Sequence, residues 1–196
     1  MAVREIRLFG DPVLRTPTPE VTDFGPDLHR LVDDMLETMD AFHGAGLAAP
    51  QVGVGARVFV YDCGGRRGHV VNPVWTALDD TTQTGPEGCL SIPGVQAACT
   101  RAARVAVTGV DRDGAPVSME VDGILARAVQ HETDHLDGVL FPQRLDPDAR
   151  RAVMRVVRAT GWFVAGQTVT DDPRVDHPVW VGDGRPAPEL AAEAVR

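Results

Sequence analysis

The chain has 196 residues and a net charge of −9, with 43% hydrophobic and 24% charged residues. This length suits one domain with a real core, and the composition is that of an ordinary globular protein. No apolar run approaches the roughly 20 residues that a membrane helix needs, and the N-terminus lacks a signal-peptide layout. We therefore expect a cytoplasmic protein without a membrane partner. The acidic net charge disfavours broad nucleic-acid binding, and no specific DNA partner is expected.

The first part of the chain predicts one helix and two hairpins. Apolar residues recur at helical spacing over 26–42, after a Gly-Pro pair that is typical of a helix start. Residues 57–62 alternate like a strand, and the glycine-rich turn at 64–68 lets the chain return. The second hairpin is clearer, because alternating apolar residues flank the turn sequence at 111–114.

The rest of the chain predicts two helices and a tail. Asp122 can cap a helix that ends near Gly138, and a further helix is expected over 147–159. The chain beyond it is rich in Asp, Pro and Gly, so we expect a folded domain over 1–160 and a tail over 161–196 that wraps the surface or is partly disordered. Helices mixed with antiparallel hairpins indicate an α+β fold, with sheets packed around a central helix and further helices toward the two termini.

The predicted central helix carries HETDH at 131–135, the HExxH spacing of metal hydrolases. Two histidines four residues apart share one helix face and can bind a single ion, while Glu132 stays within reach of its water. The alternative is a pair of structural histidines. A catalytic site needs a third protein ligand, yet 136–188 contains no Glu and Phe141 occupies the last position of the extended zincin pattern.

Cysteine could complete such a site. Cys89 offers a thiolate, which is a strong ligand for zinc or ferrous iron, and Gly88 before it allows close approach of the backbone. A role as a small core residue is favoured for a cysteine considered alone. Together with Cys63 and Cys99 it forms no CxxC pair, so all three are expected to be reduced thiols.

Three segments together resemble the motifs of the peptide deformylase family. They are GAGLAAPQ at 44–51, EGCLS at 87–91 and QHETDH at 130–135, in the family's order and at similar spacing. The general similarity runs from about residue 4 to residue 159. The resemblance implies that the chain removes the formyl group from the N-terminal formylmethionine of newly made proteins and releases formate. Its partners would then be N-formylmethionyl nascent peptides.

The resemblance also implies the chemistry of the site. One divalent metal ion per chain is expected, most often Fe2+ in this family, with Zn2+ or Ni2+ as substitutes. The expected ligands are Cys89, His131 and His135. Glu132 is expected to act as general base and then as general acid, and Gln51 with the backbone N–H of Leu90 to stabilise the oxyanion. Glu87 and Arg101 are expected to pair and to orient the cysteine loop.

The substrate is expected to bind between the first motif and the central helix. The residues expected to contact it are Gly44, Ala45, Gly46, Gly88, Leu125 and Ala128. The glycines would leave an uncrowded edge with which a peptide backbone can pair. Arg127 and Gln96 stand where some members of the family carry other residues, which leaves open the polarity of the methionine pocket and the contact with the downstream end of the peptide.

Other functions are also compatible with these residues. One is a deformylase-like metal amidase that acts on another N-acyl substrate in a biosynthetic pathway. Another is a cysteine hydrolase with Cys89 as nucleophile. A third is a non-catalytic, ribosome-associated domain, against which the retained Glu132 argues. The arginines at 150, 151, 155 and 158 form a basic stripe on the helix 147–159. A solvated helix face is favoured there over docking to ribosomal RNA, which the corresponding helix performs in some family members.

Overall fold

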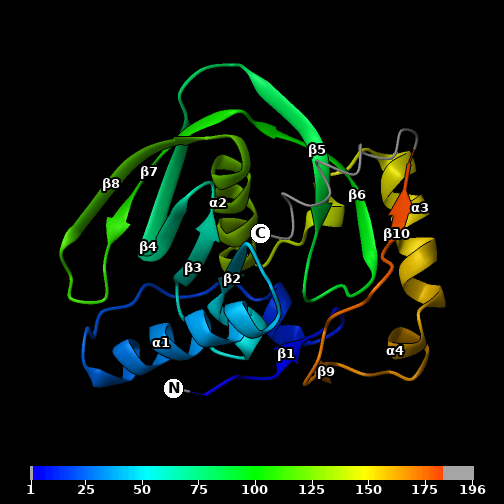
Figure 1. Ribbon diagram of the computed structural model, residues 1–196, viewed down its shortest axis with the longest axis horizontal. Coiled ribbons are helices and arrows are strands. Elements are labelled where there is room, and N and C mark those ends of the chain that lie inside the picture. The colour runs from blue at the N-terminus through cyan, green and yellow to red at the C-terminus, as the bar shows by residue number, and fades with distance from the viewer. Residues whose placement is uncertain (1, 183–196) are drawn as a thin grey trace.

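The computed structural model describes residues 2–182, and its strands form three sheets within that range (Figure 1). The largest is antiparallel, in the order β2 (Gly46–Ala48), β3 (Val58–Cys63), β4 (Arg66–Ala77), β7 (Arg104–Val110) and β8 (Pro116–Asp122). The second has the order β10 (Val179–Val181), β6 (Val95–Ala102) and β5 (Thr82–Gly88), with β10 parallel to β6. The third pairs β1 (Ile6–Arg7) with β9 (Val169–Thr170).

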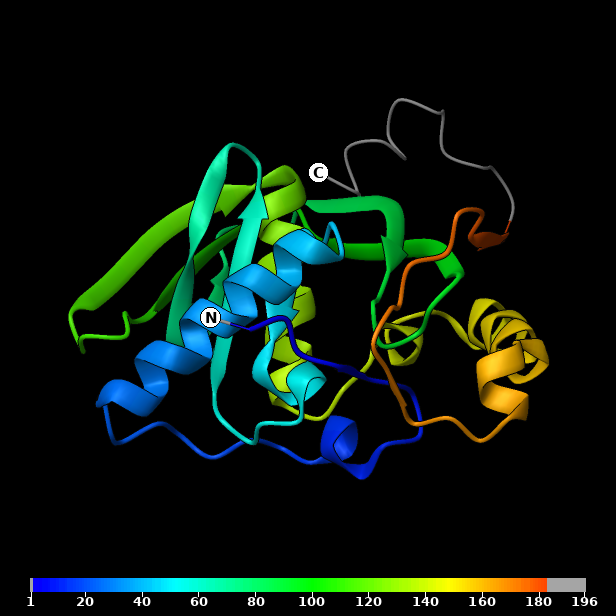
Figure 2. The ribbon, with the colours of Figure 1, turned by 60° about the horizontal axis from the view of Figure 1, so that its bottom comes forward.

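The helices cover and separate these sheets. They are α1 (Pro26–Ala41), α2 (Gly123–Leu136), α3 (Pro147–Ala159) and α4 (Gly161–Val164), with short 3-10 helices at Pro12–Arg15, Ala49–Val52 and Phe141–Gln143. In both Figure 1 and Figure 2, α2 stands between the five-stranded sheet and the sheet of β5 and β6. The predicted α+β class is confirmed, with α2 as its central helix.

The predicted local elements follow from simple sequence features. The helix expected over 26–42 is α1, which begins with Pro26 after Gly25 and buries a stripe of apolar side chains. The second hairpin is β7–β8. Its turn is closed by the Asp111 carboxylate, which accepts hydrogen bonds from the N–H groups of Asp113 and Ala115, and Gly114 adopts the positive φ of +81° that the turn requires.

Burial on every side distinguishes α2 from an ordinary amphipathic helix. All residues from Leu125 to Leu136 are buried. One face packs Ala126 and Val129 into a core cluster with Phe59 of β3 and the valines of β7, and the opposite face carries the histidines toward β5. A helix that is enclosed in this way can hold side chains in fixed positions, which is what a catalytic site needs.

The chain after α3 crosses the second sheet. Val153 and Val157 of α3 pack in a core cluster with Val95 of β6 and Val181 of β10. Trp162 donates a hydrogen bond from Nε1 to the carbonyl of Pro93 at 3.3 Å. The division into a domain over 1–160 and a tail stays a prediction, and residues 183–196 of that tail lie outside the described residues. No helix within 2–182 is long and apolar enough to cross a bilayer.

Candidate active site

The three predicted metal ligands meet in space. Cys89 lies just after β5, and His131 and His135 lie one turn apart on α2. Their ligand atoms all lie within 4.8 Å of one another, and Cys89 Sγ is 3.2 Å from His135 Nε2. Within the described residues this is the one group of three such side chains that could hold a metal ion. The geometry therefore permits Cys89 to act as a ligand, while its side chain also packs against a core cluster.

Glu87 fixes the orientation of one histidine. Its Oε1 lies 2.8 Å from His131 Nδ1, which leaves Nε2 of that ring to face the triad. Burial disfavours the charged carboxylate, yet hydrogen bonds from His131 and Arg101 outweigh this cost, so the pKa of Glu87 lies well below its usual range. A carboxylate that stays ionised in this way can hold its neighbours in place.

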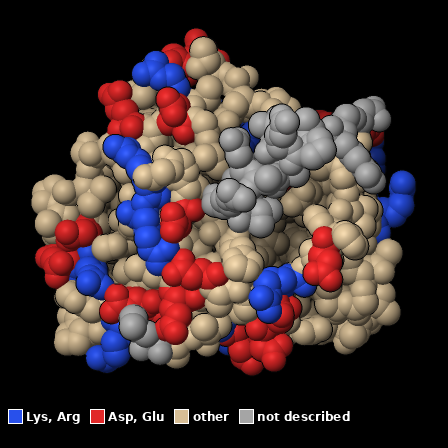
Figure 3. All heavy atoms as spheres, in the orientation of Figure 1, with Lys and Arg blue, Asp and Glu red and all other residues tan. Residues whose placement is uncertain are grey.

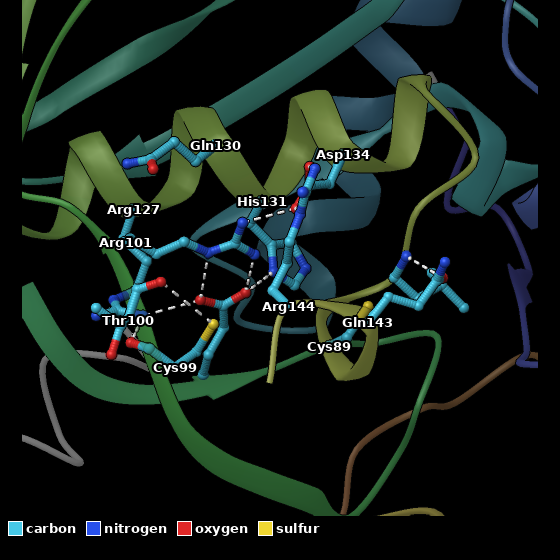
Figure 4. Close-up of polar contacts among 12 residues, drawn as sticks. Cys89, Cys99, Thr100, Arg101, Arg127, Gln130, His131, Asp134, Gln143 and Arg144 are labelled. Carbon is cyan, nitrogen blue, oxygen red and sulfur yellow. Dashed lines mark hydrogen bonds and ion pairs between the residues drawn. The ribbon is translucent and has the colours of Figure 1, made fainter. Parts of the chain in front are cut away.

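The predicted pair of Glu87 and Arg101 is part of a larger buried network (Figure 4). Arg101 on β6 donates hydrogen bonds to both carboxylate oxygens of Glu87, at 2.5 and 3.1 Å. It also donates one to Asp134 on α2 at 2.6 Å. Asp134 also accepts hydrogen bonds from Arg144 at 2.5 and 3.0 Å. Because Asp134 lies next to His135 in the sequence, the network connects β5 and β6 to the part of α2 that carries the candidate ligands.

Arg127 belongs to the same network. Its guanidinium donates to Glu87 at 2.8 Å and to the carbonyl of Cys99 at 2.9 Å. The charged end of Arg127 is therefore buried and paired, although Arg127 also lines the cleft. Sequence reasoning assigned no role to Arg127, Asp134 or Arg144. Nothing in the order of residues indicates that Arg127 meets Glu87 or that Asp134 joins Arg101 to Arg144.

Glu132 lies beside the triad as the HExxH spacing predicts. It is almost fully buried, and its Oε2 has no hydrogen-bond partner among the described residues. Burial raises the pKa of Glu132 to about 7 in the metal-free site. The opposite wall is close, because a Cβ added to Gly46 would stand 2.5 Å from Glu132 Oε1. Only glycine fits at position 46 without displacing this carboxylate.

Gln51 faces the triad from the other side. The backbone N–H of Ala48 donates to Gln51 Oε1 at 2.9 Å, so the amide NH2 points toward Cys89 Sγ at 3.5 Å and Ser91 Oγ at 3.3 Å. Leu90 follows Cys89 in the same loop, and its Cδ1 would be 3.3 Å from a Cβ on Gly44. Both predicted oxyanion residues thus border the ligand sulfur.

Gln51, Cys89, His131 and Glu132 line one cleft of about 450 Å3. His135 does not line it, but its Nε2 lies 3.2 Å from the Sγ of Cys89. Of the expected substrate contacts, the cleft is lined by Gly44, Ala45, Gly46, Gly88 and Ala128. Leu125 is an exception, because it packs into the core beside the five-stranded sheet. Ile124 lines the cleft in its place. One residue along a helix is a rotation of about 100°, so Ile124 shares the face of Ala128 and Leu125 does not.

The cleft has a further wall that sequence reasoning missed. Residues from the segment between β9 and β10 line it, among them Pro173 and Val175. Only the general expectation of a surface-wrapping tail pointed toward this segment.

Comparisons with known proteins agree with the geometry. The profile of the polypeptide deformylase family matches residues 3–151. Peptide deformylase 1 of Corynebacterium glutamicum is 60% identical over 167 residues, which cover 83% of this chain and 99% of the relative. The peptide deformylase of Acidothermus cellulolyticus is 56% identical over 169 residues, with 86% and 92% covered.

Solved structures place the fold in the same group. The peptide deformylase from Thermus thermophilus superposes with a TM-score of 0.76 at 45% identity, covering 80% of this chain and 94% of that one. The enzyme from Ehrlichia chaffeensis in complex with actinonin gives a TM-score of 0.76 at 34% identity, covering 81% and 97%. The chain belongs to the peptide deformylase family.

Proposed function

We propose that this chain is a metal-dependent peptide deformylase that acts in the cytoplasm on N-formylmethionyl nascent peptides and releases formate. Membership of the family supports the reaction. The observation that carries the proposal is the convergence of one thiol and two imidazoles beside a cleft that is also lined by a buried carboxyl and an oriented amide.

The donor set fits one divalent metal ion. Sulfur with two imidazole nitrogens suits ferrous iron or zinc, and three protein ligands leave a position for water, as catalytic sites require. We assign Cys89, His131 and His135 as the ligands and Fe2+ as the native ion, with Zn2+ or Ni2+ able to replace it. When bound, the ion supplies Lewis-acid chemistry that activates water near neutral pH.

Glu132 is assigned the proton transfers. Its free carboxyl oxygen lies beside the triad, and a pKa near 7 matches a group that must both take and give a proton. Glu132 would accept the proton of the attacking water and then donate it to the amine that leaves as the C–N bond breaks.

Gln51 and Leu90 are assigned the oxyanion. The formyl oxygen gains negative charge when water adds, and the amide NH2 of Gln51 is already turned toward the triad by its bond to Ala48. The backbone N–H of Leu90 is the second donor in this assignment. Loss of one such donor typically costs about 2.7–4 kcal/mol in the transition state.

Substrate binding is assigned to the remaining walls. The backbone of Gly44–Gly46 offers an edge strand for pairing with the peptide. Gly88 bounds the other side of the cleft, and Ala128 with Ile124 offers apolar surface to the methionine side chain.

Formate release from formyl-Met-Ala tests this proposal. The protein should be purified without oxygen, its metal content measured, and its activity followed after chelation and after addition of Fe2+, Zn2+ or Ni2+. We expect activity to disappear with the metal and to return with it, and acetyl-Met-Ala to be a poor substrate. Activity that survives complete chelation would instead favour a cysteine nucleophile.

We further infer that the exposed arginines of α3 dock on ribosomal RNA. A groove of about 540 Å3 is lined by Arg15, Arg150, Arg151, Arg155 and Arg158 together with the apolar Phe9, Leu140 and Met154. Among residues 2–182, Arg150, Arg155 and Arg158 form no ion pair. Such a concentration of guanidinium groups in a chain of net charge −9 is a local attraction for phosphate.

Charge reversal is the cleaner test of docking, because truncation before α3 would remove Val153 and Val157 from the core. We expect the triple variant R150E/R155E/R158E to co-sediment with ribosomes less than the wild type does. We also expect its co-sedimentation no longer to depend on the salt concentration. The control is R30E/R66E/R104E, which makes the same charge change at exposed sites elsewhere. Equal co-sedimentation of both triple variants would contradict docking through α3.

A further inference from the structure

The segment of residues 173–178, here called the strap, is held at both ends. Before it, β9 pairs with β1, where Thr170 lies opposite Ile6. After it, β10 pairs in parallel with β6, and the Val179 N–H donates to the carbonyl of Gly94 at 2.7 Å. Figures 1 and 2 show the strap in orange as it rises from β9 past the end of β6 to β10.

The strap is also one wall of the substrate cleft. Pro173, Arg174, Val175, Asp176 and Pro178 line the same cavity as Cys89, His131 and Glu132. Val175 rests against the loop between β5 and β6, because a Cβ added to Gly94 would stand 3.4 and 3.5 Å from its two methyl carbons. Val175 nevertheless keeps 48% of its surface exposed.

Three of the five strap residues that line the cleft are apolar, namely Pro173, Val175 and Pro178. Arg174 is held by Asp172 through two hydrogen bonds of 2.8 and 2.6 Å, so its charge is already matched. Asp176 is exposed and remains as the negative charge of the strap once Arg174 is paired with Asp172. Proline at both ends restricts the backbone, which lowers the entropy lost when a ligand is bound. On the face shown in Figure 3, the lower right has atoms of both charge signs set among uncharged ones.

The strap lies outside the part of the chain that the family has in common. The family profile ends at residue 151. The solved deformylases from Thermotoga maritima and Thermus thermophilus are covered over 99% and 94% of their lengths but reach only 75% and 80% of this chain. The strap thus follows the last residue that the family profile matches.

We propose that the strap selects the peptide residues that follow the formylated methionine, with Val175 as a specificity-determining contact for apolar side chains. This inference rests on the proposed function. His131 lines the cleft and is buried, whereas Val175 lines the same cleft and keeps 48% of its surface exposed. A substrate with its formyl group at the triad can reach the strap only with residues beyond the first.

Peptides of different length separate this role from a structural one. The substrates are formyl-Met-Ala, formyl-Met-Ala-Leu-Ala and formyl-Met-Ala-Asp-Ala, and kcat and KM are measured from formate release. We expect the wild type to prefer Leu over Asp at the third residue. V175S should lower the ratio of kcat/KM for the Leu tetrapeptide over that for formyl-Met-Ala by about three- to tenfold, through KM, and V175I should restore it.

The matched control is V179S. Val179 has 49% of its surface exposed, four residues further along the chain, and does not line the cleft, so its ratio should equal that of the wild type. An unchanged ratio in V175S, or the same shift in V179S, would overturn the role of the strap. An equal loss with all three peptides would do so too. Absence of formate release by the wild type from every peptide would instead refute the proposed function.

Discussion

Two helices of nearly equal length show opposite uses of charge. In α2 every residue from Leu125 to Leu136 is buried, whereas α3 buries only Val153 and Val157 among the residues that the structure describes. The acid Asp134 on α2 has 6% of its side chain exposed and is held by two arginines. Its counterpart Asp148 on α3 has 88% exposed and pairs with an exposed arginine one turn away.

The difference teaches which charges can fix a geometry. A buried ion must be paired, because leaving it alone costs several kcal/mol, so the partners of Asp134 and Glu87 hold definite positions. An exposed pair contributes about 0–1 kcal/mol and fixes no position. The helix α2 accordingly holds the candidate ligands in fixed positions, while α3 presents charges whose positions are not fixed.

The largest effect is expected from Glu132, the buried carboxyl with an unpartnered oxygen. E132Q keeps the volume of the side chain but cannot take a proton, so we expect kcat for formyl-Met-Ala to fall by about 10²–10⁴-fold. Metal content should stay at one ion per chain, since the three ligands remain. Formate release and metal analysis on the same preparation check this, and full activity in E132Q would refute the role of Glu132.

A paired substitution tests the contrast between the helices directly. D134N removes one of the two carboxylates that pair with the buried guanidinium of Arg101. We therefore expect the free energy of unfolding to fall by about 3–5 kcal/mol. D148N removes an exposed pair near the start of α3 and should cost about 1 kcal/mol or less. Urea unfolding of both metal-loaded variants measures the two free energies. Equal losses would contradict the claim that the buried pair stabilises the fold more than the exposed pair does.

Much of the fold follows from short-range signals. The helical periodicity of 26–42 and the turn at 111–114 predict α1 and the β7–β8 hairpin, because both depend on neighbouring residues. The strands β5 and β6 are not predicted, since Gly85 and Pro86 interrupt any alternation and the pairing is set by contacts with the rest of the fold. The pairing of β10 with β6 joins residues more than 80 positions apart, and no local pattern encodes it.

The site divides in the same way. The spacing of His131 and His135 places two ligands on one helix face from the sequence alone. Cys89 could be assigned only through the resemblance to a family, because a thiol 42 positions earlier has no geometric relation to that helix until the chain folds. Ile124 was missed because the sequence did not fix the rotation of the helix about its axis, and a rotation by one residue decides whether position 124 or position 125 faces the cleft.

The buried surroundings of α2 should also control thiol reactivity. Burial raises the pKa of the Cys63 thiol to about 12 and that of Cys99 to about 11, so at about pH 7.5 both stay protonated and unreactive. Cys89 is partly exposed. After chelation we expect iodoacetamide to label Cys89 at least about tenfold faster than the other two, and added Zn2+ to protect it. Peptide mass spectrometry gives the three rates, and uniform labelling would contradict the burial argument.

The smallest effect is expected from His69 on β4. Its side chain is partly buried, which is intermediate between the buried side chains of α2 and the exposed ones of α3. Burial lowers the pKa of His69, and the positive charge of Arg112 lowers it further. Its ring nitrogen accepts a hydrogen bond from the Arg112 N–H at 2.9 Å, which requires an unprotonated nitrogen. The folded state therefore binds fewer protons than the unfolded state. This contribution to stability is fully present above the ordinary histidine pKa of about 6.5, and it is lost as the pH falls through the lower pKa that His69 has in the folded state. We expect the melting temperature of H69N to drop less than that of the wild type between about pH 7.5 and pH 5.5, whereas H177N, at an exposed position on the strap, should follow the wild type. A pH dependence that H69N leaves unchanged would show that partial burial at this site does not matter for stability.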